Sequence, residues 1–131
     1  MTIARAALIV ASNEYDDWMF SRLRAPVHDA EALARVLRDP EIGGFEVRTL
    51  MNEPSYMVRE EIEGFFSDCH REDLLLLYFS CHGVKDVNGR LYFASRDTKL
   101  HRLSATGVAS SFVKEQMDQS RSRRIVLLLD C

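Results

Sequence analysis

Cysteine is scarce in this chain, which has three cysteines among 131 residues. An odd number of cysteines at irregular spacing does not form the disulfide framework of a small secreted protein. No pair of histidines or cysteines has the spacing of zinc ligands either, so the sequence predicts no metal centre. We therefore expect the reducing cytoplasm as the compartment of this protein.

The chain also lacks a surplus of basic residues, a long apolar run and a glycine-rich phosphate loop. Its formal net charge of −3 does not indicate a surface for nucleic acid. Its longest apolar runs fall far short of the roughly 20 residues that cross a bilayer, and its first residues make a poor signal peptide. We expect neither a nucleic acid nor a membrane as a partner. The missing phosphate loop also disfavours a nucleotide-binding domain.

What the chain does have is apolar strands that alternate with helices. Continuous apolar runs at 6–11, 74–79 and 125–129 predict strands that are buried on both faces. Residues 45–50 alternate between apolar and polar side chains, which indicates a strand nearer the edge of the sheet. Asn88-Gly89, between two short strand-like pieces, predicts a hairpin over 84–93.

Three helices are predicted between these strands. The first begins at Pro26, the second at Pro54, and the third spans 108–119, whereas 96–106 is expected to be an irregular surface loop. Strands that alternate with helices predict an α/β fold whose mostly parallel sheet is covered on both faces. A chain of 131 residues, of which 47% are hydrophobic, is long enough and apolar enough for one domain with a core.

Two of the apolar runs stop at a reactive side chain, one at His82 and the other at Cys131. Chemistry in parallel sheets gathers at the carboxyl ends of the strands, and neighbouring strands lie about 5 Å apart. A histidine can generate the thiolate of a nearby cysteine, and one family of cysteine peptidases places its histidine about 50 residues before the cysteine, close to the 131 − 82 = 49 residues seen here. Gly83 has no side chain, so its N–H could approach a developing oxyanion closely.

Each of these residues alone has a simpler interpretation. A single histidine after a strand is more often structural, and a single cysteine is more often an inert thiol. The occurrence of both at one edge of the sheet favours chemistry. We interpret Cys69 and Cys81 as core residues, and Cys81 as a packing residue rather than a second nucleophile. His70 and His101 lie in polar segments, where we expect them to face solvent.

Four motifs make the chain resemble the caspase-like cysteine peptidases, and specifically their bacterial metacaspase-like branch. Residues 9–15 resemble the first strand of that family and the Gly-Asn-x-x-Tyr stretch after it, and 23–30 resemble the Leu-x-x-Pro/Cys-x-x-Asp-Ala start of its first helix. Residues 78–83 are similar to Tyr-x-Ser-Gly-His-Gly, and 127–131 are similar to the strand that ends in Asp-Cys. The resemblance implies a three-layer α/β/α sandwich.

The resemblance also implies a role for the residues at the matching positions. His82 would be the general base and Cys131 the nucleophile, and the N–H groups of Gly83 and Cys131 would bind the oxyanion. No cofactor is required for this chemistry. Calcium, a partner or oligomerisation all remain open as the activating trigger.

An acidic pocket is implied for the residue before the cleaved bond. Its matching positions are Asp29, Asp130 and the hydroxyl of Ser80, which implies cleavage after arginine or lysine. A simpler interpretation of Asp29 is a charge at a helix N-terminus, worth less than about 1 kcal/mol. Tyr15 or Trp18 in the first loop are candidates to line the substrate groove.

Two features depart from the family pattern. Cys81 stands where the family has glycine, and the chain ends at Cys131, before the segment that forms the small subunit of the family. Without that segment the last strand would be an exposed apolar edge. We therefore expect residues 1–131 to be the large-subunit part of a caspase-like domain, with a small-subunit segment or a second chain that completes the sheet.

The sequence thus predicts a cysteine endopeptidase that acts on polypeptides through a Cys–His dyad. A bacterial role in defence, signalling or cell death is implied by the resemblance alone. A regulatory or scaffold module that keeps the fold without turnover is the alternative, and Cys81 beside the histidine motivates it.

Overall fold

A four-stranded parallel sheet forms the centre of the computed structural model, which describes residues 4–20 and 26–131, without the side chains of Pro26 and Val27. All of its strand pairs are parallel, as predicted, and the strand order is β2-β1-β3-β7. These strands are β1 (Arg5–Ala11), β2 (Glu46–Met51), β3 (Leu74–Ser80) and β7 (Arg124–Asp130). The alternating segment, β2, lies at one edge of the sheet, as expected.

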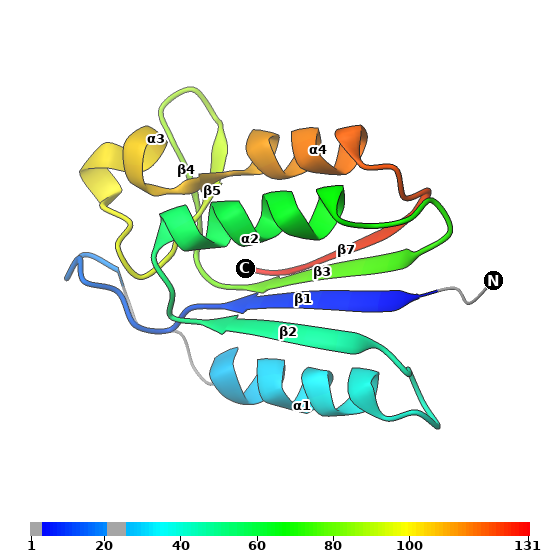
Figure 1. The fold of residues 1–131 in the computed structure, drawn as a ribbon. Coiled ribbons are helices and arrows are strands. Elements are labelled where there is room, and N and C mark those ends of the chain that lie inside the picture. The colour runs from blue at the N-terminus through cyan, green and yellow to red at the C-terminus, as the bar shows by residue number, and fades with distance from the viewer. Residues whose placement is uncertain (1–3, 21–25) are drawn as a thin grey trace.

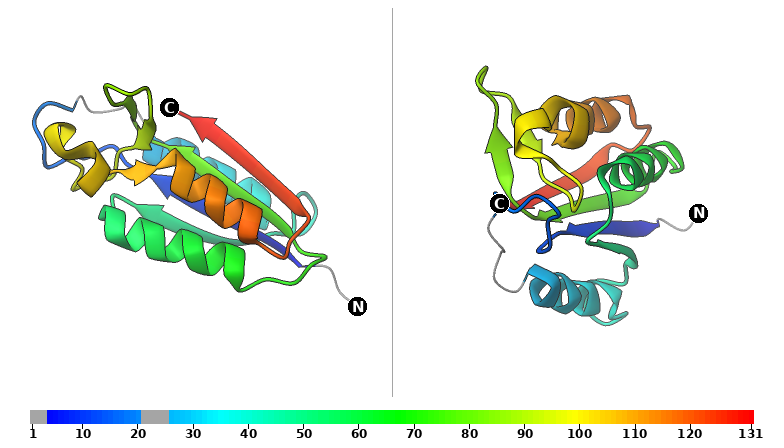
Figure 2. Two further views of the ribbon diagram at one scale, coloured as in Figure 1. Left: turned by 90° about the horizontal axis from the view of Figure 1, so that it is seen from above. Right: turned by 90° about the vertical axis from the view of Figure 1, so that its left-hand side faces the viewer.

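Helices cover both faces of this sheet (Figures 1 and 2). Helix α1 (Pro26–Arg38) lies on one face, and α2 (Ser55–Ser67) and α4 (Ser110–Gln119) lie together on the other. The sandwich of three layers that the sequence predicted is therefore confirmed. No helix among residues 4–20 and 26–131 is both long enough and apolar enough to span a membrane.

A small antiparallel sheet stands beside the carboxyl ends of the parallel strands. It contains β4 (Gly83–Lys85), β5 (Leu91–Phe93) and β6 (Val108–Ala109) in the order β4-β5-β6. The hairpin between β4 and β5 was predicted, and Gly89 in its turn has a φ of 79°, a conformation that glycine adopts easily. The prediction of a helix from residue 108 was wrong at its start, because residues 108–109 pair with β5 and the helix begins at Ser110.

The segment 96–106, predicted as an irregular surface loop, is partly helical and partly buried. It contains a 3₁₀ helix, η1 (Leu100–Arg102), and a short α-helix, α3 (Leu103–Thr106). The side chain of Thr98 is fully buried, and its Oγ1 accepts the N–H of Ser95 and donates to the Thr106 carbonyl. The prediction failed because a buried polar side chain that bonds to the backbone organises the segment, and this leaves no apolar pattern in the sequence.

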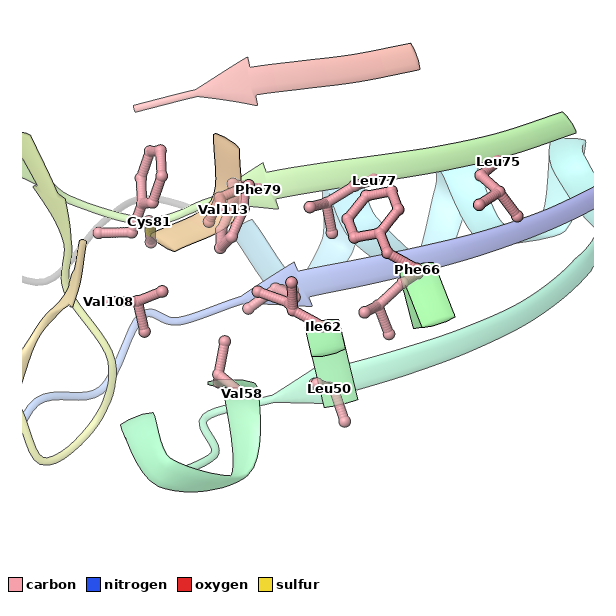
Figure 3. Packing of buried hydrophobic residues seen from close by; sticks show 13 residues of the cluster. Leu50, Val58, Ile62, Phe66, Leu75, Leu77, Phe79, Cys81, Val108 and Val113 are labelled. Atoms are coloured by element: carbon pink, nitrogen blue, oxygen red, sulfur yellow. The ribbon is translucent and has the colours of Figure 1, made fainter. Parts of the chain in front are cut away.

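The main core lies between the sheet and the pair α2 and α4 (Figure 3). Alternate residues of β3 point into it, and the rings of Phe79 and Phe93 stack with centroids 4.3 Å apart. Cys81 lies at the carboxyl end of this row and is 1% exposed, which confirms its interpretation as a core residue (Figure 3). The opposite side chains of β1 pack against α1 in a second, smaller cluster.

Strand β7 forms the other edge of the sheet. Within the described part of the chain, its outer edge has no strand partner. Its apolar side chains are correspondingly open to solvent, with Val126 39%, Leu128 41% and Leu129 50% exposed. The prediction that 125–129 forms a strand buried on both faces is therefore wrong for the described residues, whereas the exposed apolar edge expected without a further strand is present.

Candidate active site

The carboxyl ends of the parallel strands meet the first loop, the hairpin and Cys131 at one end of the molecule (Figure 1). The last paired residues of β3 and the edge strand β7 are Ser80 and Asp130. Cys81 and Cys131 follow directly in the same register, and the N–H of Cys81 donates to the Asp130 carbonyl at 3.4 Å. The sheet itself therefore brings residues 81 and 131 side by side.

Cys131 lies against the residues on both sides of His82. The sulfur of Cys81 is 3.9 Å from the sulfur of Cys131. On the other side, a Cβ atom added to Gly83 would lie 3.3 Å from the Cβ of Cys131, so the missing side chain of Gly83 allows this close approach. The backbone that carries His82 thus runs along Cys131, and two of the predicted site residues, Gly83 and Cys131, are in contact.

The two cysteine sulfurs form a hydrogen bond that separates their acidities. This hydrogen bond and burial together raise the pKa of Cys81 well above the ordinary value of a thiol. The same bond lowers the pKa of Cys131, against the opposing effect of its own partial burial. Of the two cysteines, the exposed Cys131 therefore forms a thiolate more easily than the buried Cys81.

The first loop holds the backbone of His82 in place. The N–H of His82 donates to the Tyr15 hydroxyl at 3.1 Å, and that hydroxyl donates to the Ser12 carbonyl at 3.0 Å. The ring of His82 has its centroid 5.3 Å from that of Tyr15 and 6.0 Å from that of Phe20. Burial also raises the pKa of Tyr15, so its hydroxyl stays protonated and can donate. The hairpin adds a bond from the Ala94 N–H to the His82 carbonyl.

Replacing Tyr15 with phenylalanine is expected to loosen this anchor. Tyr15→Phe removes both the acceptor of the His82 N–H and the donor to the Ser12 carbonyl, and the loss of these two bonds at a half-buried site costs about 1–3 kcal/mol. Urea unfolding would show this as a lower midpoint with an unchanged slope. Tyr56→Phe is the matched control, because Tyr56 is 56% exposed on α2. Equal midpoints for the two variants would contradict the anchoring role of Tyr15.

The three residues predicted to form an acidic pocket lie around the ring of Tyr78. The Tyr78 hydroxyl donates to Asp130 Oδ2 at 3.3 Å. Burial raises the pKa of Tyr78, the Ser80 hydroxyl opposes this shift, and the negative charges of Asp130 and Asp29 add to it. Asp29 and Asp130 are exposed and Ser80 is buried. Asp29, Ser80 and Asp130 are thus close enough to Tyr78 to act on one phenol.

Sequence reasoning missed three features of this site. Tyr78 was considered only as part of a motif, although its place on the side of β3 opposite Phe79 puts it in line with Asp130. Phe20 carried no signal, because it lies in a loop. The contact between Cys81 and Cys131 could have been found from register alone, since each cysteine follows a neighbouring strand by one residue.

Other residues predicted from the sequence lie away from this cluster or outside the described residues. Trp18 is 87% exposed, and its role in a substrate groove stays a prediction. Leu23, Arg24 and Ala25, which carry part of the helix-start motif, lie outside the described residues. Across residues 4–20 and 26–131, no three or more histidine, cysteine or acidic side chains are grouped so that they could hold a metal ion. Activation by calcium stays a prediction from the resemblance.

Comparison with known proteins identifies the family of this chain. A family model described as a caspase domain, Peptidase_C14, matches residues 4–131. The crystal structure of protein GSU0716 from Geobacter sulfurreducens superimposes with a TM-score of 0.74 at 19% identity, over 96% of this chain and 48% of that one. This chain thus spans about half the length of the Geobacter protein, and the similarity shows a shared fold.

No curated protein matches the sequence. The caspase-domain match nevertheless covers nearly the whole chain and agrees with the parallel sheet and its helical layers. On this basis the chain belongs to the caspase-domain family, which indicates a function of the cysteine-peptidase type.

Proposed function

We propose that the protein is a cysteine endopeptidase in which Cys131 is the nucleophile and His82 is the general base. The observation that carries this proposal is the position of Cys131 against both chain neighbours of His82, at the carboxyl ends of adjacent strands. A histidine and a cysteine that follow neighbouring strands support the proposal, because activation of a thiol needs a base within hydrogen-bond reach of the sulfur.

In the proposed reaction, His82 takes the proton of the Cys131 thiol, and the thiolate attacks the carbonyl carbon of the peptide bond. The N–H groups of Gly83 and Cys131 are the candidate donors to the oxyanion that forms. His82 then gives its proton to the leaving amine, which leaves an acyl group on the Cys131 sulfur. Water, deprotonated by His82, hydrolyses this thioester and restores the free thiol.

We propose that the substrate presents arginine or lysine before the cleaved bond. Asp29 and Asp130 place two carboxylates near Tyr78, on the side of the sheet that α1 covers. A cationic side chain placed between them would form charge-assisted hydrogen bonds, which are about twice as strong as neutral ones. The buried Ser80 hydroxyl offers a further acceptor to a guanidinium group.

The remaining parts of the proposal concern the whole protein. Residues 1–131 would act as the large-subunit part of the domain, and a small-subunit segment or a second chain would pair with the outer edge of β7. The exposed side chains of Val126, Leu128 and Leu129 support this. The resemblance of the motifs supports a place in the bacterial metacaspase-like branch and a role in defence, signalling or cell death. The irregular spacing of the three cysteines supports a cytoplasmic location.

The alternative is a scaffold that keeps the fold without turnover. Cys81 favours it, because this position carries a side chain where the related motif has glycine. In such a protein Cys131 would have no need of unusual reactivity. The rate at which its thiol is alkylated therefore separates the two functions.

The deciding experiment combines peptide cleavage with thiol labelling of the purified protein. Fluorogenic peptides that end in arginine or lysine should be hydrolysed, and matched peptides that end in aspartate should not. Iodoacetamide should label Cys131 faster than free cysteine, and the advantage should grow as the pH falls below about 8.5, because a lowered pKa keeps the thiolate populated there. If no peptide is cleaved and Cys131 is labelled no faster than free cysteine, the protein is a scaffold instead.

A further inference from the structure

A second thiol lies in contact with the candidate nucleophile. The sulfurs of Cys81 and Cys131 are 3.9 Å apart, at the ends of strands that pair in register. Cys81 is 1% exposed, whereas Cys131 is exposed. A reagent in solution can therefore reach the sulfur of Cys131 but not that of Cys81. The peptidase mechanism uses only one of these two thiols.

We propose that Cys81 is the resolving thiol of this site: when a hydroperoxide oxidises Cys131, Cys81 captures the oxidised sulfur as a reversible Cys81–Cys131 disulfide. This disulfide would block the Cys131 thiol reversibly and protect it from further oxidation. The proposal needs an oxidisable Cys131 and does not depend on peptide cleavage.

The chemistry has two balanced steps. In the first, the Cys131 thiolate attacks one oxygen of the hydroperoxide, the O–O bond breaks, and Cys131 becomes a sulfenic acid while hydroxide or alkoxide leaves. In the second, the Cys81 sulfur attacks the sulfur of the sulfenic acid. The S–S bond forms, the S–O bond breaks, and the Cys81 proton leaves with the oxygen as water. The hydroperoxide is the oxidant, and both electrons come from the pair of cysteines.

The geometry of the sheet suits this second step. Strands in a sheet lie about 4.8 Å apart, and the Cα atoms of disulfide-bonded cysteines lie about 4.4–6.8 Å apart. The register holds residues 81 and 131 together, through the bond from the Cys81 N–H to the Asp130 carbonyl. The two sulfurs need to approach by only about 2 Å to reach bonding distance, which rotation of the exposed Cys131 side chain can supply.

The third cysteine is placed for no such reaction. Cys69 follows the last turn of α2, at the opposite end of the sheet from Cys131 (Figure 1). Its sulfur lies 3.4 Å from the Ser120 hydroxyl and 3.3 Å from the Phe66 carbonyl. Oxidation of Cys131 should therefore recruit Cys81 and leave Cys69 as a free thiol, which makes Cys69 the internal control.

The test is to treat the reduced protein with hydrogen peroxide, block free thiols with iodoacetamide in denaturant so that the buried Cys81 is also accessible, and map the cysteines by mass spectrometry without reduction. We expect the peptide that contains Cys81 to be linked to the peptide that contains Cys131, with Cys69 alkylated. After dithiothreitol, Cys131 should again accept iodoacetamide. Recovery of Cys131 as sulfinic or sulfonic acid beside an alkylated Cys81, or a disulfide that involves Cys69, would overturn the proposal.

Variants sharpen the test. In Cys81→Ala and Cys81→Ser, peroxide should carry Cys131 to sulfinic and sulfonic acid, so that dithiothreitol no longer restores its labelling. Cys69→Ser should behave as the parent protein does. Because the linked peptide is sought in the unsubstituted protein, instability of a Cys81 variant leaves the main result intact. A protein that forms the disulfide but cleaves no peptide would refute the proposed function and support this inference.

Discussion

Replacing Cys131 with alanine is expected to lower kcat/KM for an arginine peptide by about 10⁴- to 10⁶-fold, and His82→Ala should cost nearly as much. In the proposed mechanism the thiol supplies the attacking atom, and the imidazole supplies the base for that thiol and the acid for the leaving amine. If the two residues act as one unit in this way, each contributes little without the other.

The double variant makes this expectation sharper. If Cys131 and His82 act together, the variant that lacks both should be about as slow as either single variant, because residues of one catalytic unit are far from additive. Initial rates of peptide hydrolysis for the four proteins complete the cycle. Circular dichroism should show the same fold in all of them, since Cys131 is exposed and contributes little to the core.

Cys69→Ala is the matched control for the loss of a thiol. It removes a half-buried cysteine at the far end of the sheet and should leave kcat/KM unchanged. Substantial activity in Cys131→Ala, or losses in the two single variants that simply multiply, would show that the two side chains do not form one catalytic unit.

The second large effect is expected from the carboxylates around Tyr78. Asp130→Asn keeps the shape of the side chain but removes its charge. Asp130 is exposed in this structure, so the cost of about 2–5 kcal/mol for a truncated charge pair applies to the complex, in which bound substrate excludes water. With about 1.4 kcal/mol for each tenfold change, kcat/KM for arginine and lysine peptides should fall by about 30- to 4,000-fold. Asp29→Asn should have a smaller effect in the same direction, because Asp130 accepts a hydrogen bond from Tyr78, whereas Asp29 acts on Tyr78 through its charge.

The specificity of this loss distinguishes a pocket from general damage. Alkylation of Cys131 by iodoacetamide should stay fast in Asp130→Asn, because that small reagent needs no acidic pocket. Asp118→Asn is the control, since it removes the same charge from a surface ion pair with Lys114 on α4. If the parent protein, Asp130→Asn and Asp118→Asn cleave arginine peptides equally well, the acidic pocket is excluded.

The order of strands and helices could be predicted because it depends on local patterns of apolar residues. The continuous runs of β1 and β3 identified the buried centre of the sheet, and the alternation in β2 identified its edge. Segment 96–106 could not be predicted in this way. Its fold depends on Thr98, whose hydroxyl bonds to backbone groups three and eight residues away, and no periodicity records such a bond.

The candidate site shows the same division between local and distant information. The positions of His82 and Cys131 after their strands were readable, because strand ends can be located from composition. The support that Tyr15 gives to His82 joins residues that are 67 positions apart, and it depends on the path of a polar loop. The pairing of Cys81 with Cys131 needed the register of two strands, which apolar runs alone do not fix.

The edge position of β7 gives the two partners of the site unequal mechanical support. His82 follows β3, which is paired on both sides, whereas Cys131 follows a strand whose amides are bonded on one side within the described residues. Local opening begins where few contacts must break, so β7 should fray before β3 does. A strand that docks along β7 would therefore stiffen Cys131, the proposed nucleophile, more than His82, the proposed base. Assembly at that edge could in this way set the reaction rate without touching the substrate.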